Sequence, residues 1–188
     1  MKKIKINKKI LSGIIALLIA GIGNYVINEE PSLPYSGQSV ENQLSVELER
    51  VIDGDTLVFS DGSQEQKLRL LLIDTPESSR TKTGSSQPYG KEAKEFLTTY
   101  LEGKNLTIEY EDTHERLDTY DRVLAYLFAD GELVQEVLVR EGLARVGYEK
   151  GNELYLSRLQ SAEQTAIEKK VNIWSIEGYV GKYGFNKK

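Results

Sequence analysis

The sequence contains no cysteine and a single histidine, His114. The lack of cysteine excludes a disulfide-stabilised scaffold, a thiolate metal site, a cysteine nucleophile and a lipidated cysteine. One histidine excludes metal sites built from several imidazoles and disfavours a Ser-His-Asp triad. Any bound metal would therefore meet mainly oxygen ligands, which favours calcium or magnesium over zinc or copper. We expect His114 to be a solvated loop residue rather than a catalytic one.

Positive charge is scarce outside the N-terminus. The 188 residues suffice for one ordinary domain plus a targeting segment or tail. The net charge is −5, yet the first nine residues hold five lysines and no acidic residue, so the body of the chain is more acidic still. An acidic body disfavours a bulk nucleic-acid binder, for which a basic surface is expected. Contact with phosphates would need local cations or a bound metal.

Residues 1–27 combine the lysine cluster with an apolar run of 18 residues, Ile10–Ile27. A basic start before an apolar run is the layout of a secretory signal, while 18 residues is near the minimum for a membrane span. The pattern leaves open a cleaved signal peptide and an uncleaved apolar helix that anchors the chain to the membrane. Both alternatives predict a protein that is secreted or held on the extracellular face of the cell membrane. A flexible linker is expected at 28–44.

The next segment, residues 45–177, shows the patterns of five strands and three helices. The expected strands are 45–52, 56–60, 66–73, 105–110 and 122–128. The expected helices are 90–102, 132–140 and 153–170, the last with Asn152 as its N-cap. Asp-Gly pairs after the first two strands predict a three-stranded meander. The order predicts an α+β fold, a five-stranded Greek-key OB-type barrel with three helices, followed by a C-terminal tail at 178–188.

Two acidic clusters interrupt this apolar pattern. Asp53-Gly54-Asp55-Thr56 occupies a predicted hairpin, and Asp74-Thr75-Pro76-Glu77 follows the third strand. The meander is expected to bring Asp55 and Asp74 together at one rim of the barrel. Facing carboxylates repel one another unless a proton or a cation lies between them, and a hard divalent ion accepts carboxylate, carbonyl and water oxygens. Taken singly, each cluster is also explained as ordinary turn or helix-start chemistry.

A third polar element, RLDTYDR at 116–122, places Arg122 at the start of a strand beside Asp118 and Asp121. Taken alone, this element is explained as a surface ion pair of little energetic value.

Six motifs in order resemble the staphylococcal nuclease (thermonuclease) family, from about Val46 to Trp174. They are IDGDT at 52–56, RLLLIDTPE at 69–77, YG at 89–90, DRVLAY at 121–126, LVREGLARV at 138–146 and NIW at 172–174. The resemblance implies the same OB barrel with three helices. It also implies an exported, monomeric, calcium-dependent nuclease that cleaves DNA and RNA and leaves 3′-phosphate products.

The resemblance also implies the ligands of the metal. Asp55 and Asp74 would bind Ca²⁺ through their carboxylates, and Thr75 would bind it through its backbone carbonyl. Asp53 would lie behind these ligands without touching the ion.

The remaining implied roles belong to catalysis and substrate binding. Arg69 and Arg122 would hold the phosphate and the charge that develops on it, because the planar guanidinium matches phosphate oxygens. Glu77 would act as general base or position the attacking water. Tyr120 and Tyr148 would contact the nucleotide.

Two departures from the family pattern lower the expected affinity for nucleic acid. The domain is acidic, and Thr119 stands where a lysine helps to hold a nucleotide phosphate. Two alternatives to a nuclease stay open: a catalytically weak nucleic-acid-binding module at the cell surface, and a structural cell-surface protein with an incidental metal site.

Overall fold

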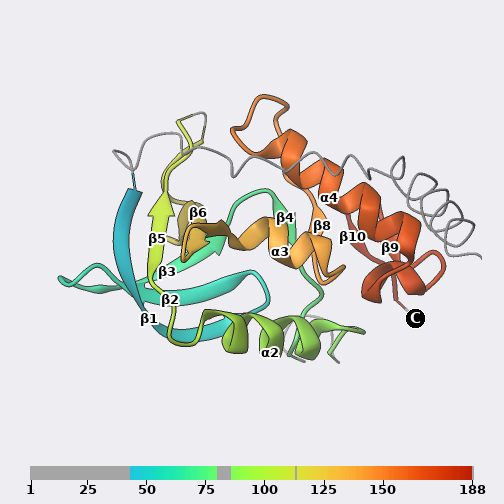
Figure 1. Ribbon diagram of the computed structural model, residues 1–188, viewed down its shortest axis with the longest axis horizontal. Coiled ribbons are helices and arrows are strands. Elements are labelled where there is room, and N and C mark those ends of the chain that lie inside the picture. The colour runs from blue at the N-terminus through green and yellow to red at the C-terminus, as the bar shows by residue number, and fades with distance from the viewer. Residues whose placement is uncertain (1–42, 80–85, 113, 188) are drawn as a thin grey trace, which may run out of the picture. The chain divides into compact units, whose positions relative to one another are not determined.

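The predicted five-stranded barrel is confirmed by a computed structural model of the chain, which describes residues 43–79, 86–112 and 114–187. Its strands are β1 (Gln43–Asp53), β2 (Thr56–Ser60), β3 (Glu65–Leu70), β5 (Leu106–Glu109) and β6 (Val123–Ala129). Antiparallel pairing runs in the order β3-β2-β1-β5-β6, and parallel pairing of β3 with β6 closes the ring. The meander that the Asp-Gly turns predict is β1-β2-β3 (Figure 1).

The strand sequences explain the core of the barrel. Leu57 and Phe59 of β2 and Leu68 of β3 are completely buried. In β6, VLAYLFA, all residues but one are buried, because this strand also packs against a helix. Burying one such side chain contributes about 1.5–3 kcal/mol, so these strands supply much of the stability of the barrel.

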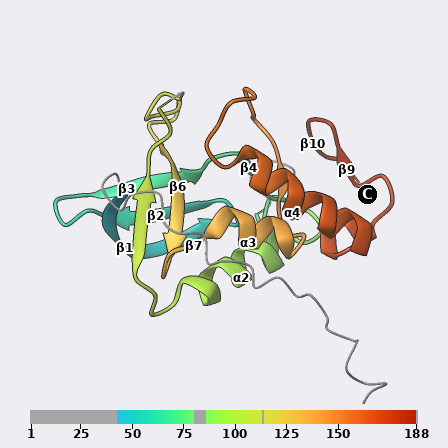
Figure 2. The same ribbon diagram turned by 45° about the horizontal axis from the view of Figure 1, so that its top comes forward.

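Three helices flank the barrel, as predicted: α2 (Gly90–Leu101), α3 (Val134–Arg140) and α4 (Leu156–Lys169). The helix α2 packs against β1, and its buried face includes Ala93, Leu97 and Leu101. The helix α3 packs against both β6 and α4, which lie beside it in Figures 1 and 2.

Two helix starts differ from the prediction. The short strand β7 (Glu132–Leu133) pairs with β6, so α3 begins at Val134 instead of residue 132. The prediction of Asn152 as the N-cap of the last helix is wrong, because Tyr155 occupies that position. The Glu153 carboxylate instead accepts hydrogen bonds from the backbone N–H groups of Lys150 and Gly151 and so fixes a turn before the helix.

The strand expected at 66–73 is divided in two. The strand β3 ends at Leu70, and Leu72 adopts a left-handed conformation with φ of 63°. The chain then changes partner: β4 (Ile73–Asp74) pairs with β8 (Arg145–Val146), outside the barrel. This change places Asp74 directly opposite Arg145.

The chain ends in a 3₁₀ helix, η2 (Asn172–Ser175), followed by a small hairpin of β9 (Val180–Gly181) and β10 (Gly184–Phe185). This hairpin lies within the segment predicted as a tail (Figure 2). The predicted signal or anchor at 1–27, and all but the last two residues of the linker predicted at 28–44, lie outside the described residues. Among the described residues no helix has the length and apolar character needed to cross a membrane.

Candidate active site

The two acidic clusters and both arginines line one pocket of about 320 Å³ beside the β1–β2 turn. The pocket brings together nearly all residues that the sequence analysis selected: Asp53, Asp55, Arg69, Asp74, Thr75, Glu77, Arg122 and Tyr148. Tyr120 lines an adjoining pocket of about 540 Å³, which shares Arg69, Arg122 and Tyr148 with the first.

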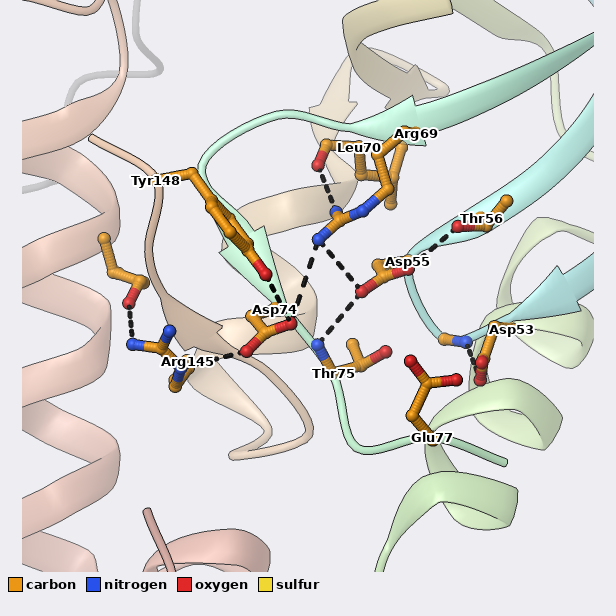
Figure 3. A network of polar contacts seen from close by, with 12 residues as sticks. Asp53, Asp55, Thr56, Arg69, Leu70, Asp74, Thr75, Glu77, Arg145 and Tyr148 are labelled. Carbon is orange, nitrogen blue, oxygen red and sulfur yellow. Dashed lines mark hydrogen bonds and ion pairs between the residues drawn. The ribbon is translucent and has the colours of Figure 1, made fainter. Parts of the chain in front are cut away.

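Asp55 and Asp74 meet at the guanidinium of Arg69. The Nη2 atom of Arg69 lies 3.3 Å from Asp55 Oδ2 and 3.9 Å from Asp74 Oδ1. Arg69 itself is held by a 2.7 Å hydrogen bond from its Nη1 to the carbonyl of Leu70. Figure 3 shows the arginine reaching in from β3 between a carboxylate of the hairpin turn and a carboxylate of β4. The predicted convergence of the two aspartates at one rim therefore corresponds to the observed arrangement.

The surroundings of the two aspartates differ. Asp55 accepts hydrogen bonds from the Thr75 N–H at 3.1 Å and the Thr56 hydroxyl at 2.9 Å. Burial raises the pKa of Asp74; Arg145 and Arg69 oppose this shift, and the charge of Asp55 adds to it. A further cation at this position would relieve the repulsion between the carboxylates and hold both in the charged form.

The oxygen atoms at this position fit a hard divalent ion. The two carboxylates and the backbone carbonyl of Thr75 are the oxygen donors that calcium prefers. The hydroxyl of Thr75 is buried and makes no hydrogen bond to any described residue, which is typical of a polar atom completed by water or an ion. In the described parts of the chain no three Asp, Glu, His or Cys side chains come together as a metal site. A metal ion at this position would therefore be coordinated by the two aspartates, a carbonyl oxygen and water.

The backbone on both sides of Glu77 is fixed. The Glu77 N–H donates to Gln87 Oε1 at 2.8 Å, and the Gln87 N–H donates to the Glu77 carbonyl at 2.9 Å. At Gly90 a Cβ would lie 2.3 Å from the Glu77 carbonyl oxygen, so only glycine fits there. In Figure 3 the Glu77 carboxylate lies beside Asp55 and Asp53. The two hydrogen bonds with Gln87 thus fix the backbone of Glu77, the predicted general base, beside the pocket.

Asp53 supports this part of the pocket from behind. Its Oδ1 accepts hydrogen bonds from the N–H groups of Gly54 at 2.9 Å and Ser78 at 3.2 Å. Burial raises the pKa of Asp53, and the Gly54 hydrogen bond opposes that shift. The carboxylate therefore ties the β1–β2 turn to the segment that carries Glu77.

Arg122 is oriented by Asp118. The Asp118 Oδ2 atom lies 2.7 Å from Arg122 Nε and 2.6 Å from Nη2. Burial opposes the ionisation of Asp118, but the hydrogen bonds from Arg122 and Tyr120 leave its pKa below the ordinary value. The pair that the sequence analysis considered as a surface ion pair thus includes an arginine that lines the pocket.

The two tyrosines lie at the rim with their rings open to solvent. Tyr120 is 77% exposed and Tyr148 is 66% exposed. The Arg69 guanidinium lies 5.5 Å from the Tyr148 ring, and the Arg122 guanidinium lies 5.5 Å from the Tyr120 ring. Each ring therefore lies next to one of the two arginines and offers a stacking surface beside it.

Two supporting residues were missed by the sequence analysis: Gln87 and Arg145. Arg145 Nε donates to Asp74 Oδ2 at 3.1 Å, from a strand that the apolar pattern did not reveal. The prediction of a solvated His114 is wrong, because its side chain is 9% exposed and lies 3.8 Å from Glu153. Gln87, Arg145 and His114 each contact a residue at least ten positions away, which no local spacing indicates.

The comparisons with known proteins agree with the motifs. A family model described as "Staphylococcal nuclease homologue" matches residues 67–176. A thermonuclease of Staphylococcus hyicus is 38% identical over 170 residues, covering 89% of this chain and 99% of that protein. Endonuclease YncB of Bacillus subtilis is 38% identical over 159 residues, covering 84% of this chain and 74% of that protein. A thermonuclease of Staphylococcus intermedius is 35% identical over 170 residues, covering 89% of this chain and 98% of that protein. With the same barrel and the same motifs in order, the chain belongs to the staphylococcal nuclease family.

Proposed function

We propose that the chain is an exported, calcium-dependent nuclease that hydrolyses phosphodiester bonds of DNA and RNA and leaves 3′-phosphate ends. The observation that carries the proposal is the meeting of Asp55 and Asp74 at Arg69, in a pocket that Glu77 and Arg122 also line. The relatives' names, thermonuclease and endonuclease, support the same class of reaction.

The pocket provides charge where hydrolysis needs it. A phosphodiester carries one negative charge, and attack by water adds negative charge at the transition state. Bound between Asp55, Asp74 and the Thr75 carbonyl, Ca²⁺ would supply positive charge beside the phosphate oxygens. Arg69 and Arg122 donate hydrogen bonds to those oxygens, and losing either one would slow the reaction by about 10²–10⁴-fold.

Glu77 takes the proton of the attacking water. The water oxygen forms a bond to phosphorus, the bond from phosphorus to the 5′ oxygen breaks, and the departing 5′ oxygen takes up a proton from solvent water. The phosphate stays on the 3′ side. A positioned carboxylate base contributes about 10²–10⁴ in rate.

The rim tyrosines and the N-terminal segment complete the proposal. Tyr120 and Tyr148 offer aromatic faces to the bases of a flexible strand, a mode of binding that tolerates every base and suits both DNA and RNA. Residues 1–27 have the layout of an export signal or membrane anchor, which would place the enzyme outside the cell. We propose that it acts there as a monomer.

The test is a cleavage assay on the full chain with single-stranded and double-stranded DNA and with RNA. We expect cleavage with Ca²⁺, its loss with EDTA, its return on adding excess Ca²⁺, and products that carry 3′-phosphates. Glu77→Gln is expected to lower kcat by about 10²–10⁴-fold, because the amide cannot accept the proton. Other divalent ions assayed in parallel show which of them replaces calcium.

Glu49→Gln, which changes an exposed carboxylate on β1, is the matched control and should cleave like the unchanged chain. Full activity of Glu77→Gln would show that the base is misassigned. A chain that binds DNA but does not cleave it with any divalent ion would contradict the proposal and favour the binding module.

A further inference from the structure

The hairpin β9–β10 lies beyond the region that the family model matches, yet it packs against the active site. The match ends at residue 176, and the hairpin follows at 180–185. A Cβ built on Gly184 would lie 3.7 Å from Asp74 Oδ2. The carbonyl of Lys182 accepts a hydrogen bond from Arg145 Nη1 at 3.5 Å. The hairpin therefore borders a proposed calcium ligand and the arginine beside it.

Arg145 connects the hairpin to Asp74. Pairing of β4 with β8 places Arg145 opposite Asp74, and Nε donates to Asp74 Oδ2 at 3.1 Å. Nη1 also donates to the carbonyl of Val146 at 3.1 Å. Only 8% of Arg145 is exposed, so its planar guanidinium depends on these fixed acceptors. Figure 3 shows Arg145 approaching Asp74 from the side opposite Arg69.

This arrangement gives the two oxygens of Asp74 different surroundings. Arg145 occupies Oδ2, whereas Oδ1 faces the Tyr148 hydroxyl at 3.4 Å and Arg69 Nη2 at 3.9 Å. Tyr148 and Arg69 line the pocket, so Oδ1 is the oxygen that faces it. Rotation of the carboxylate would break the bond to Arg145 and leave a buried cation without its partner, which is unfavourable.

Tyr179 fixes the hairpin to the other side of the site. Its side chain is completely buried, its hydroxyl donates to the Pro88 carbonyl at 2.8 Å, and its ring lies 5.2 Å from that of Phe185. Pro88 follows Gln87, which holds the backbone of Glu77. One C-terminal segment thus contacts the supports of both Asp74 and Glu77.

We propose that Arg145 and the β9–β10 hairpin act together as a positioning unit that holds Asp74 Oδ2 and presents Oδ1 to the metal. The inference rests on the proposed calcium-dependent function. It adds to the proposed calcium site one residue, Arg145, and one C-terminal segment, the β9–β10 hairpin, on which calcium affinity depends. Neither is expected to touch the substrate, so the effect should appear first in metal binding.

Calcium affinity of the full chain, measured by isothermal titration calorimetry, tests the unit directly. Arg145→Met removes every donor but keeps an unbranched stem, and we expect it to weaken calcium binding by about 10–100-fold. Arg145→Lys keeps the charge without the planar fork and should recover part of this loss. Gly184→Ala adds a methyl group beside Asp74 at a φ of +135°, and should weaken binding as well.

Two further variants separate positioning from general damage. Gly62→Ala introduces similar backbone strain at a φ of +86°, where a Cβ meets nothing within 4 Å, and should bind calcium normally. Tyr179→Phe removes only the hydroxyl anchor and should weaken calcium binding slightly. Urea unfolding of every variant shows whether it is folded. If Arg145→Met does not fold, Gly184→Ala and Tyr179→Phe still test the inference.

The outcomes are distinct. Unchanged calcium affinity in folded Arg145→Met and in Gly184→Ala would overturn the inference, and so would an equal loss in Gly62→Ala and Gly184→Ala. An unchanged chain that neither binds calcium nor cleaves nucleic acid would contradict the proposed function itself.

Discussion

Single side chains in this site work through partners that hold them in one orientation. Arg122 is the clearest case, because both its Nε and Nη2 atoms contact one oxygen of Asp118. Asp118 also accepts hydrogen bonds from the N–H groups of Tyr120 and Arg122. The carboxylate therefore fixes the turn and the guanidinium together. In the proposed reaction, an arginine with this support would already be oriented, which lowers the entropy lost on binding the phosphate.

Replacing Asp118 should slow the reaction without unfolding the barrel. Asp118→Asn removes the charge that holds Arg122, and we expect kcat for DNA cleavage to fall by about 10–100-fold, part of what loss of Arg122 itself would cause. Steady-state kinetics in Ca²⁺ measure the effect. Asp121→Asn changes the same charge at an exposed position of the same turn and should leave kcat unchanged. Equal kcat values for both variants would show that Arg122 needs no such partner.

At the scale of elements, the sequence predicted what local pattern determines. Apolar alternation and Asp-Gly turns identified the strands of the barrel, and helical spacing identified the three helices. The short strands β4 and β8 were missed, because two-residue strands carry no periodicity. The left-handed Leu72 that separates β3 from β4 is likewise invisible in a run of leucines. Those unpredicted strands are what bring Arg145 to Asp74.

The start of α4 was misplaced for a related reason. The sequence NELYLSR was interpreted as a capped helix, but Glu153 turns back to bind the backbone of residues 150 and 151. The loop before α4 also carries Tyr148, so the turn fixed by Glu153 contributes to the shape of the pocket rim. Side-chain to backbone hydrogen bonds of this kind carry no apolar period, so helical spacing alone did not reveal them.

Glu153 should make the stability of this loop depend on pH. Burial opposes its ionisation, but hydrogen bonds from Lys150 and Gly151 and the nearby His114 leave its pKa below the ordinary 4.5. Its contribution is therefore present above pH 4.5 and lost as the pH falls through the lower folded-state pKa. We expect Glu153→Gln to lower the free energy of unfolding by about 1.5–3 kcal/mol at neutral pH, and the difference to vanish in stronger acid.

Urea unfolding of both proteins across the acidic range measures this difference. Glu149→Gln, an exposed change in the same loop, is the control and should have little effect at any pH. If Glu153→Gln lost as much stability in strong acid as at neutral pH, the charged form of Glu153 would not be what holds the loop.

Across the whole molecule, an acidic protein must attract a polyanion through a few cations placed at the site. The net charge is −5, and the cations that line the two adjoining pockets in the described residues are Lys67, Arg69, Arg122 and Lys150. Arg69 and Arg122 are paired with carboxylates of the site. Binding should therefore release few counterions, and the salt dependence should be shallow.

For a single-stranded oligonucleotide, we expect log K to fall with log salt concentration with a slope of about −1.5 to −3, from about 0.7 per neutralised phosphate and two to four cations. Fluorescence anisotropy of a labelled strand in EDTA, where cleavage does not occur, measures this slope. Lys67→Ala and Lys150→Ala should each make the slope shallower by about 0.7. Lys104→Ala should leave it unchanged, because Lys104 follows α2 and lines a different pocket. A slope of about −5 or steeper would require cations outside these pockets to contact the strand, and the two pockets would then be only part of the nucleic-acid surface.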